Sequence, residues 1–183
     1  MPAPLSESVP DAMGEYPIQG WFTKRFGVEN AMSWIFWAIL IAAILHIAEE
    51  YRGEWLVWVR RYVPGVTLFH FVLVNTAFLL LCVAGAVVGV KNVVFSLSIA
   101  SLVFSNALMH IIPTVVWKEY SPGVITAVLL YIPLGAYAYV LAFGKEEVSL
   151  GMGAVAIVLG VFWMMLPIIG QQVRIKVEKS QSR

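Results

Sequence analysis

The chain has 183 residues, of which 60% are hydrophobic and 13% are charged. A soluble domain is about half apolar and about a quarter charged, so this composition predicts an integral membrane protein. The formal net charge of +1 provides no basic surface for nucleic acid, and this excludes nucleic acid as an expected partner.

The chain divides into three parts by composition. Residues 1–28 contain acidic residues and prolines without an apolar core, which predicts a polar N-terminal tail and an interfacial segment rather than a signal peptide. Residues 29–172 contain the long apolar stretches and are expected to form a transmembrane bundle. Residues 173–183 are expected to form a basic C-terminal tail.

A membrane-spanning helix needs about 20 mostly apolar residues. Five stretches meet this requirement, at about residues 31–51, 66–90, 93–117, 123–143 and 150–170. Residues 52–65, between the first two, mix tryptophan and tyrosine with arginine, which predicts a short helix at the membrane interface. The expected fold class is therefore all-α: a multi-pass transmembrane helical bundle of about five spans plus a short interfacial helix.

The distribution of basic residues predicts the orientation in the cell membrane. With five spans, one side of the membrane holds four basic residues: Lys24, Arg25, Lys91 and Lys145. The other side holds eight: Arg52, Arg60, Arg61, Lys118, Arg174, Lys176, Lys179 and Arg183. This excess predicts that the C-terminus is cytoplasmic.

Ionisable residues lie inside the predicted spans, where each costs a few kcal/mol to hold. They include all three histidines of the chain, and the set is His46, Glu49, Glu50, His70 and His110. The chain direction puts the end of the first span, the start of the second and the end of the third on the same side. At 1.5 Å per residue, the five groups lie at one depth, roughly 6–10 Å below the cytoplasmic surface.

Helical spacing supports this convergence. At about 100° per residue, Glu49 and Glu50 lie on the two flanks of the face that carries His46, at about −60° and +40°. In the third span, Asn106 lies four residues before His110 and shares its face.

This set of donors predicts a divalent metal site, with zinc as the first choice and iron or manganese as alternatives. The predicted metal ligands are His46, Glu49, Glu50, His70 and His110. One of the two glutamates is expected to bind the metal while the other acts as general base. Asn106 is expected to stabilise an oxyanion or to orient His110.

The sequence resembles the HXXEE-domain family of integral membrane proteins. The motif that names the family is present as His46-Ile47-Ala48-Glu49-Glu50, and Asn106 with His110 matches a second element of that family. A fainter similarity links the double glutamate, histidines and asparagine to the CAAX-protease and bacteriocin-processing membrane family. The resemblance implies where the site lies but leaves the reaction undefined.

The sequence predicts a metal-dependent, hydrolase-like membrane enzyme that acts on an apolar or lipid-like substrate near the cytoplasmic face. One alternative is a proton- or ion-coupled transporter with a His/Glu relay. Another is a haem protein with two histidine axial ligands. A third is a membrane-interface protein in which these residues only anchor or pack the helices.

Overall fold

The computed structural model describes residues 29–181, and this part of the chain is helical without strands. The predicted tail over residues 1–28 lies outside the described residues. The predicted all-α fold is confirmed. In chain order the elements are α2 (Glu29–Arg52), α3 (Trp55–Arg60), α4 (Leu68–Val88), η1 (Gly89–Asn92), α5 (Val93–Trp117), α6 (Val124–Thr126), η2 (Ala127–Tyr131), α7 (Ile132–Gly144) and α8 (Leu150–Gln181).

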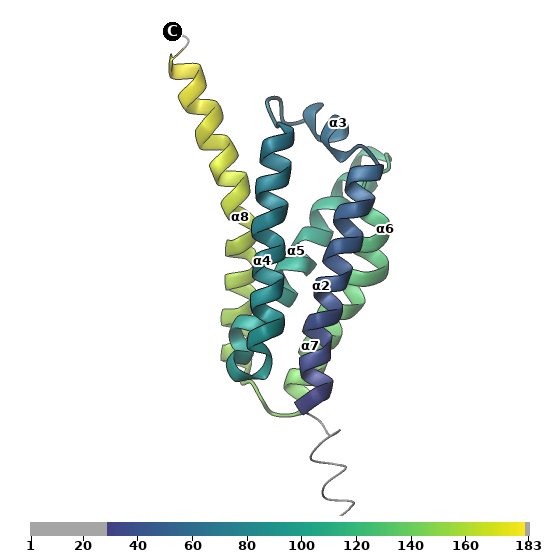
Figure 1. Cartoon of the computed structure of the whole chain (residues 1–183), viewed down its shortest axis with the longest axis vertical. Helices are drawn as coiled ribbons and strands as arrows, with labels where there is room; N and C mark the ends of the chain where they lie inside the picture. Colours follow the sequence, from purple (N-terminus) through teal and green to yellow (C-terminus); the bar gives the residue numbers. More distant parts are fainter. Residues whose placement is uncertain (1–28, 182–183) are drawn as a thin grey trace, which may run out of the picture.

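By length and composition, four helical segments can cross a membrane: Ser33–Arg52, Leu68–Trp117, Val124–Gly144 and Leu150–Val177. The second segment has 50 residues and includes α4, η1 and α5. As one rod it would be about 75 Å long, more than twice the thickness of a bilayer core. Instead α4 and α5 run side by side in opposite directions (Figure 1), so the five predicted spans correspond to five passes.

The turn between α4 and α5 follows from one glycine and one serine. Gly89 ends α4 with a φ of +52°, in the left-handed region that glycine adopts without steric cost. The buried Ser96 hydroxyl lies 2.9 Å from the carbonyl oxygen of Gly89 and so donates to the end of α4. The carbonyl is therefore satisfied inside the protein, as a bilayer requires.

The outer surface of the bundle is apolar. Leu80, Leu129 and Val158 expose 65–67% of their surface, and each lies on a different helix. An aqueous protein rarely exposes large contiguous apolar areas, whereas lipid is a favourable solvent for them. The exposed faces therefore support a membrane location.

The short helix α3 lies at the end of the bundle where α2 ends and α4 begins (Figure 1). The Tyr62 ring, just after α3, stacks on the Trp117 ring at the end of α5 with centroids 3.9 Å apart. Arg61 forms an ion pair with Glu119, which lies in the loop between α5 and α6. These contacts hold the segment after α3 against the end of α5, at the end of the bundle where the site is predicted.

The helix α8 continues beyond the predicted fifth span. Residues 171–181 remain helical and extend past the ends of the other helices (Figure 1). Arg174 in this extension donates to the carbonyl oxygen of Gly65, 2.6 Å away, before α4 begins. The basic residues that the sequence assigns to a tail are thus carried on a helix as far as Gln181.

Candidate metal centre

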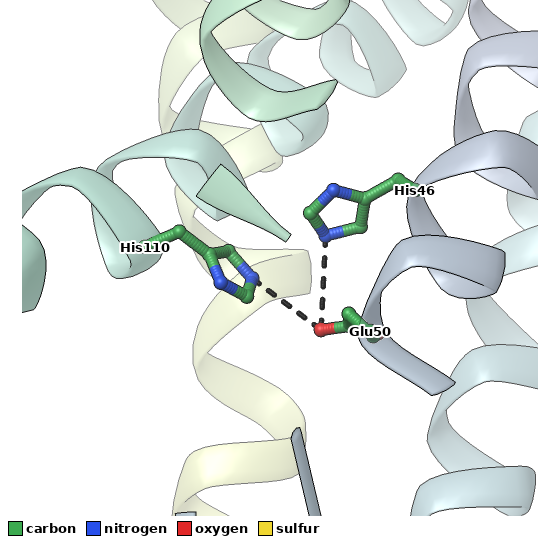
Figure 2. A group of neighbouring side chains, drawn as sticks. All are labelled: His46, Glu50 and His110. Carbon is green, nitrogen blue, oxygen red and sulfur yellow. Dashed lines mark ion pairs between the residues drawn. The ribbon is translucent and has the colours of Figure 1, made fainter. Parts of the chain in front are cut away.

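Three buried side chains converge between α2 and α5 (Figure 2). Glu50 Oε1 lies 3.7 Å from His46 Nε2 and 3.4 Å from His110 Nε2. One ligand atom from each residue lies within 4.8 Å of the others. His46 and Glu50 share one face of α2 because they are four residues apart, and His110 faces them from α5.

Burial makes this group costly unless its polar atoms are satisfied. The exposed fractions are 1% for His46, 5% for Glu50 and 3% for His110. Isolated carboxylates and imidazoles in an apolar interior are strongly disfavoured, so they are normally paired or bound to a metal. The three side chains thus form a polar site in an otherwise apolar bundle.

The hydroxyl of Thr126 fixes the orientation of the His46 ring. Thr126 Oγ1 lies 2.5 Å from Glu49 Oε2 and 2.9 Å from His46 Nδ1. A carboxylate oxygen only accepts, so the single hydroxyl proton goes to Glu49 and Thr126 accepts from His46 Nδ1–H. The neutral ring then carries its free lone pair on Nε2, which is the atom that faces Glu50.

A second hydroxyl holds the other histidine. Ser121 Oγ is buried and lies 3.1 Å from His110 Nδ1. Each imidazole therefore meets a hydroxyl at its outer nitrogen and Glu50 at its inner nitrogen. Oriented outer nitrogens of this kind are typical of histidines that bind metals.

Gly123 allows the two rings to meet. Its φ is +105°, and a Cβ at this position would lie 2.7 Å from His46 Cε1 and 2.8 Å from His110 Cε1. Any side chain would therefore push both rings out of place, in addition to the strain of the left-handed conformation.

Glu49 has a different role from its neighbour. Its carboxylate accepts hydrogen bonds from the backbone N–H groups of Gly123, Ile125 and Thr126, at 3.1, 3.0 and 2.8 Å. The Tyr120 hydroxyl also donates to Glu49, over 2.7 Å. The carboxylate thus caps the start of the helix that begins at Val124, where a negative charge is favourable.

The residue types and two of the three donor separations suit a divalent metal ion. Zinc bound to nitrogen and oxygen at about 2.1 Å in a tetrahedral arrangement separates its ligand atoms by about 3.4 Å. The two distances from Glu50 Oε1, 3.4 and 3.7 Å, are close to this value, and the three ligand atoms all lie within 4.8 Å of one another. Among the described residues His46 Nε2 is a buried nitrogen without a hydrogen-bond partner, so its lone pair is available to an ion.

Comparison with known proteins gives a match to the family described as "Protein of unknown function with HXXEE motif", over residues 37–138. This is more than half of the chain. The chain belongs to the HXXEE family. No curated protein and no solved structure matches it. The similarity to the CAAX-protease family stays a prediction.

The HXXEE motif is thus divided between two tasks in this chain. His46 and the second glutamate, Glu50, belong to the three-residue group, together with His110 from the second predicted element. The first glutamate, Glu49, is occupied by the α6 cap and is not among the three. Glu50 is therefore the glutamate placed to bind an ion, and the role of general base for the other glutamate stays a prediction.

His70 lies outside the group, although the sequence predicts it as a ligand. Of the described histidines and acids, only His46, Glu50 and His110 come together. His70 lies in the first turn of α4, and its Nδ1 is 2.5 Å from Oγ1 of the N-cap residue Thr67. The ring therefore belongs to the helix start.

Asn106, predicted to stabilise an oxyanion or to orient His110, lies on α5 one turn before His110, and no hydrogen bond joins it to the three ligand residues in the described structure. Its side chain lines a cavity together with Asn75, Leu102 and Trp163. Its Oδ1 atom is buried and has no hydrogen-bond partner within the described range. The other asparagine, Asn75, interacts with Glu50 from α4.

Sequence reasoning missed the segment that begins the fourth span. Ser121, Gly123 and Thr126 supply two hydroxyls and the space for the rings. Tyr131, the last residue of η2, is fully buried, and its ring centroid lies 4.6 Å from that of His46. The Ser-Pro-Gly sequence at 121–123 signals a turn but not its contact with the histidines. The π-helix of η2, which places Tyr131, has no clear sequence signal.

Proposed function

We propose that this HXXEE-family chain is a metal-dependent membrane enzyme, hydrolase-like, acting on an apolar or lipid-like substrate. His46, Glu50 and His110 would bind the ion. The carrying observation is the convergence of two imidazole Nε2 atoms on Glu50 Oε1, with both outer nitrogens against hydroxyls. His46 and Glu50 lie in the last two turns of α2, just before α3, at the end of the bundle that the basic residues predict to be cytoplasmic.

The donor set supports zinc and leaves iron as the main competitor. Two histidines and one glutamate bind catalytic zinc in hydrolases, and two histidines with one carboxylate also bind non-haem iron. A zinc ion held by His46, Glu50 and His110 would supply the activation of a water molecule as a nucleophile near neutral pH.

Residues of the chain would then accept the proton released by the water molecule and orient the ligands. Glu50 Oε1 faces both imidazoles, so its other oxygen, Oε2, is the atom that would accept a proton from the attacking water. The hydrogen bonds that link Glu49, Thr126 and His46 would keep the Nε2 lone pair of His46 directed at the ion. The surrounding apolar helices would exclude bulk water and strengthen these interactions.

Elemental analysis of the purified protein tests the metal site. The wild type is expected to carry about one equivalent of zinc, iron or manganese, and His46→Ala and His110→Ala are expected to lose it. His70→Ala is the matched control because it removes a histidine at a similar depth but outside the group. A wild type that binds none of these metals, even when they are supplied, would refute the site.

The reaction is tested with lipids. Wild type and His46→Ala, each in nanodiscs, are incubated with a total lipid extract, and mass spectrometry compares the lipids before and after. Hydrolysis products formed only by the wild type would support the enzyme. Metal binding without any change in lipids would refute the hydrolase proposal while leaving the site intact.

The geometry also bears on the haem and transporter alternatives. Axial histidines approach a haem iron from opposite faces, whereas His46 and His110 both direct Nε2 at one oxygen, with ring centroids 4.8 Å apart. This arrangement disfavours haem. A proton relay would use the same buried residues without a metal, so a metal-free wild type would favour the transporter.

A further inference from the structure

A cavity of about 270 Å³ lies beside the proposed metal centre, between α4, α5 and α8. Within the described chain, α8 packs chiefly against α5 and has few contacts with α4, which leaves a crevice with α5 as its floor. The exposed side chains of Leu73 and Leu166 lie at its rim. Both belong to membrane-spanning segments, so the crevice opens towards lipid.

Two carboxamides stand out in this apolar lining. Asn75 comes from α4 and also interacts with Glu50, so it connects the cavity to the metal centre. Asn106 comes from α5, one helical turn before His110, and its buried Oδ1 has no partner among the described residues. A buried acceptor without a partner is destabilising, and a ligand that donates a hydrogen bond would satisfy it.

The size of the cavity limits the ligand. At about 30 Å³ for each water-sized volume, 270 Å³ holds roughly nine such volumes. This lies just below the range of about 300–1,000 Å³ for small-molecule pockets, so the cavity fits part of one chain but not a two-chain phospholipid.

We propose that the crevice between α4 and α8 binds a single-chain lipid, with its hydroxyl or amide group at Asn106 and Asn75 and its apolar chain passing out beside Leu73 and Leu166. The inference rests on the proposed function, because the lipid would be the substrate that reaches the metal centre beside Asn75. It adds the substrate class and the route of entry.

Photocrosslinking tests the crevice without measuring activity. The protein in nanodiscs is labelled with a monoacylglycerol that carries a diazirine on its chain, and labelled peptides are mapped by mass spectrometry. The expected adducts are on α4 and α8 around Ala77 and Met164, which line the cavity. Ala77→Trp, which would fill the cavity, is expected to reduce this labelling about tenfold.

Two further variants keep the test decisive if Ala77→Trp folds poorly. Leu73→Trp narrows the exposed rim and is expected to reduce labelling severalfold, whereas Leu80→Trp alters an exposed position on the same helix outside the lining and is expected to leave it within twofold. Asn106→Leu is expected to reduce labelling by the monoacylglycerol about fivefold. It should not reduce labelling by the matched diazirine alkane, which has no donor.

The outcomes separate this proposal from the metal site. His46→Ala is expected to lose metal but keep labelling, and Ala77→Trp is expected to lose labelling but keep metal. Labelling spread evenly over the lipid-facing helices and unchanged in Ala77→Trp would overturn the crevice proposal, because bulk lipid alone would explain it. So would a dimer in native mass spectrometry with the cavity peptides protected, because a second copy would then fill the crevice.

Discussion

Replacing Thr126 with valine tests the orientation of His46 with almost no change in side-chain shape. The hydroxyl accepts from His46 Nδ1 at 2.9 Å and donates to Glu49 Oε2 at 2.5 Å. Without it the ring loses the contact that selects its tautomer, and loss of such a partner typically weakens metal affinity 10- to 100-fold. This corresponds to about 1.4–2.7 kcal/mol of binding free energy.

The metal-free protein should also become less stable. In Thr126→Val, His46 Nδ1 would be a buried donor without a partner, which costs about 1–3 kcal/mol of the free energy of unfolding. Glu49 keeps the N–H of residue 126, at 2.8 Å, so the helix start should survive.

Competition with a chelator of known affinity measures the zinc dissociation constant of the wild type, Thr126→Val and Thr126→Ser. The serine variant keeps the hydroxyl and is expected to stay within about threefold of the wild type. If the valine and wild-type constants agree within twofold, Thr126 does not orient a ligand, and the tautomer argument is wrong.

Three further predictions concern neighbouring residues. Gly123→Ala is expected to lower the free energy of unfolding by about 1–2 kcal/mol because of the φ of +105° alone, which thermal unfolding measures. It is also expected to abolish metal binding, because the new Cβ would displace both histidine rings, and elemental analysis measures this loss. Glu49→Gln is expected to lower the free energy of unfolding by about 1.5–3 kcal/mol through the weakened α6 cap while metal content stays unchanged, whereas loss of metal would show that Glu49 is a ligand after all. Burial, and then the hydrogen bond to Glu49, raise the pKa of Tyr120 from 10.0 to about 12. Folding therefore favours the neutral phenol, so the contribution of Tyr120 to the free energy of unfolding is present below pH 10 and is lost as the pH rises to about 12. Tyr120→Phe should show a shallower fall in the free energy of unfolding over this pH range.

The end of the bundle at which the histidines lie could be predicted, because it depends only on chain direction and helix length. His46, His70 and His110 all lie on the passes that meet at the α3 end of the bundle. The direction of each side chain could not be predicted in the same way, because it depends on how neighbouring helices are rotated. His70 shares the end of the bundle with the other two histidines, but it pairs with Thr67 at the start of its own helix.

The role of Glu49 shows the same limit at shorter range. The i, i+4 spacing correctly pairs His46 with Glu50, since both residues belong to one rigid helix. Glu49 is equally close in sequence, but the start of α6 packs beside it and offers three N–H donors. That partner begins more than 70 residues later, and no local pattern identifies it.

The sequence by itself determined the membrane class, the helical passes, the short helix after the first pass and the residue types of the candidate metal centre, because apolar length and helical periodicity are local properties. Only the tertiary structure decided which donors come together, which hydroxyls contact them and where a cavity opens. These depend on contacts such as His46 with Thr126 and His110 with Ser121, which form when separate helices pack at specific rotations.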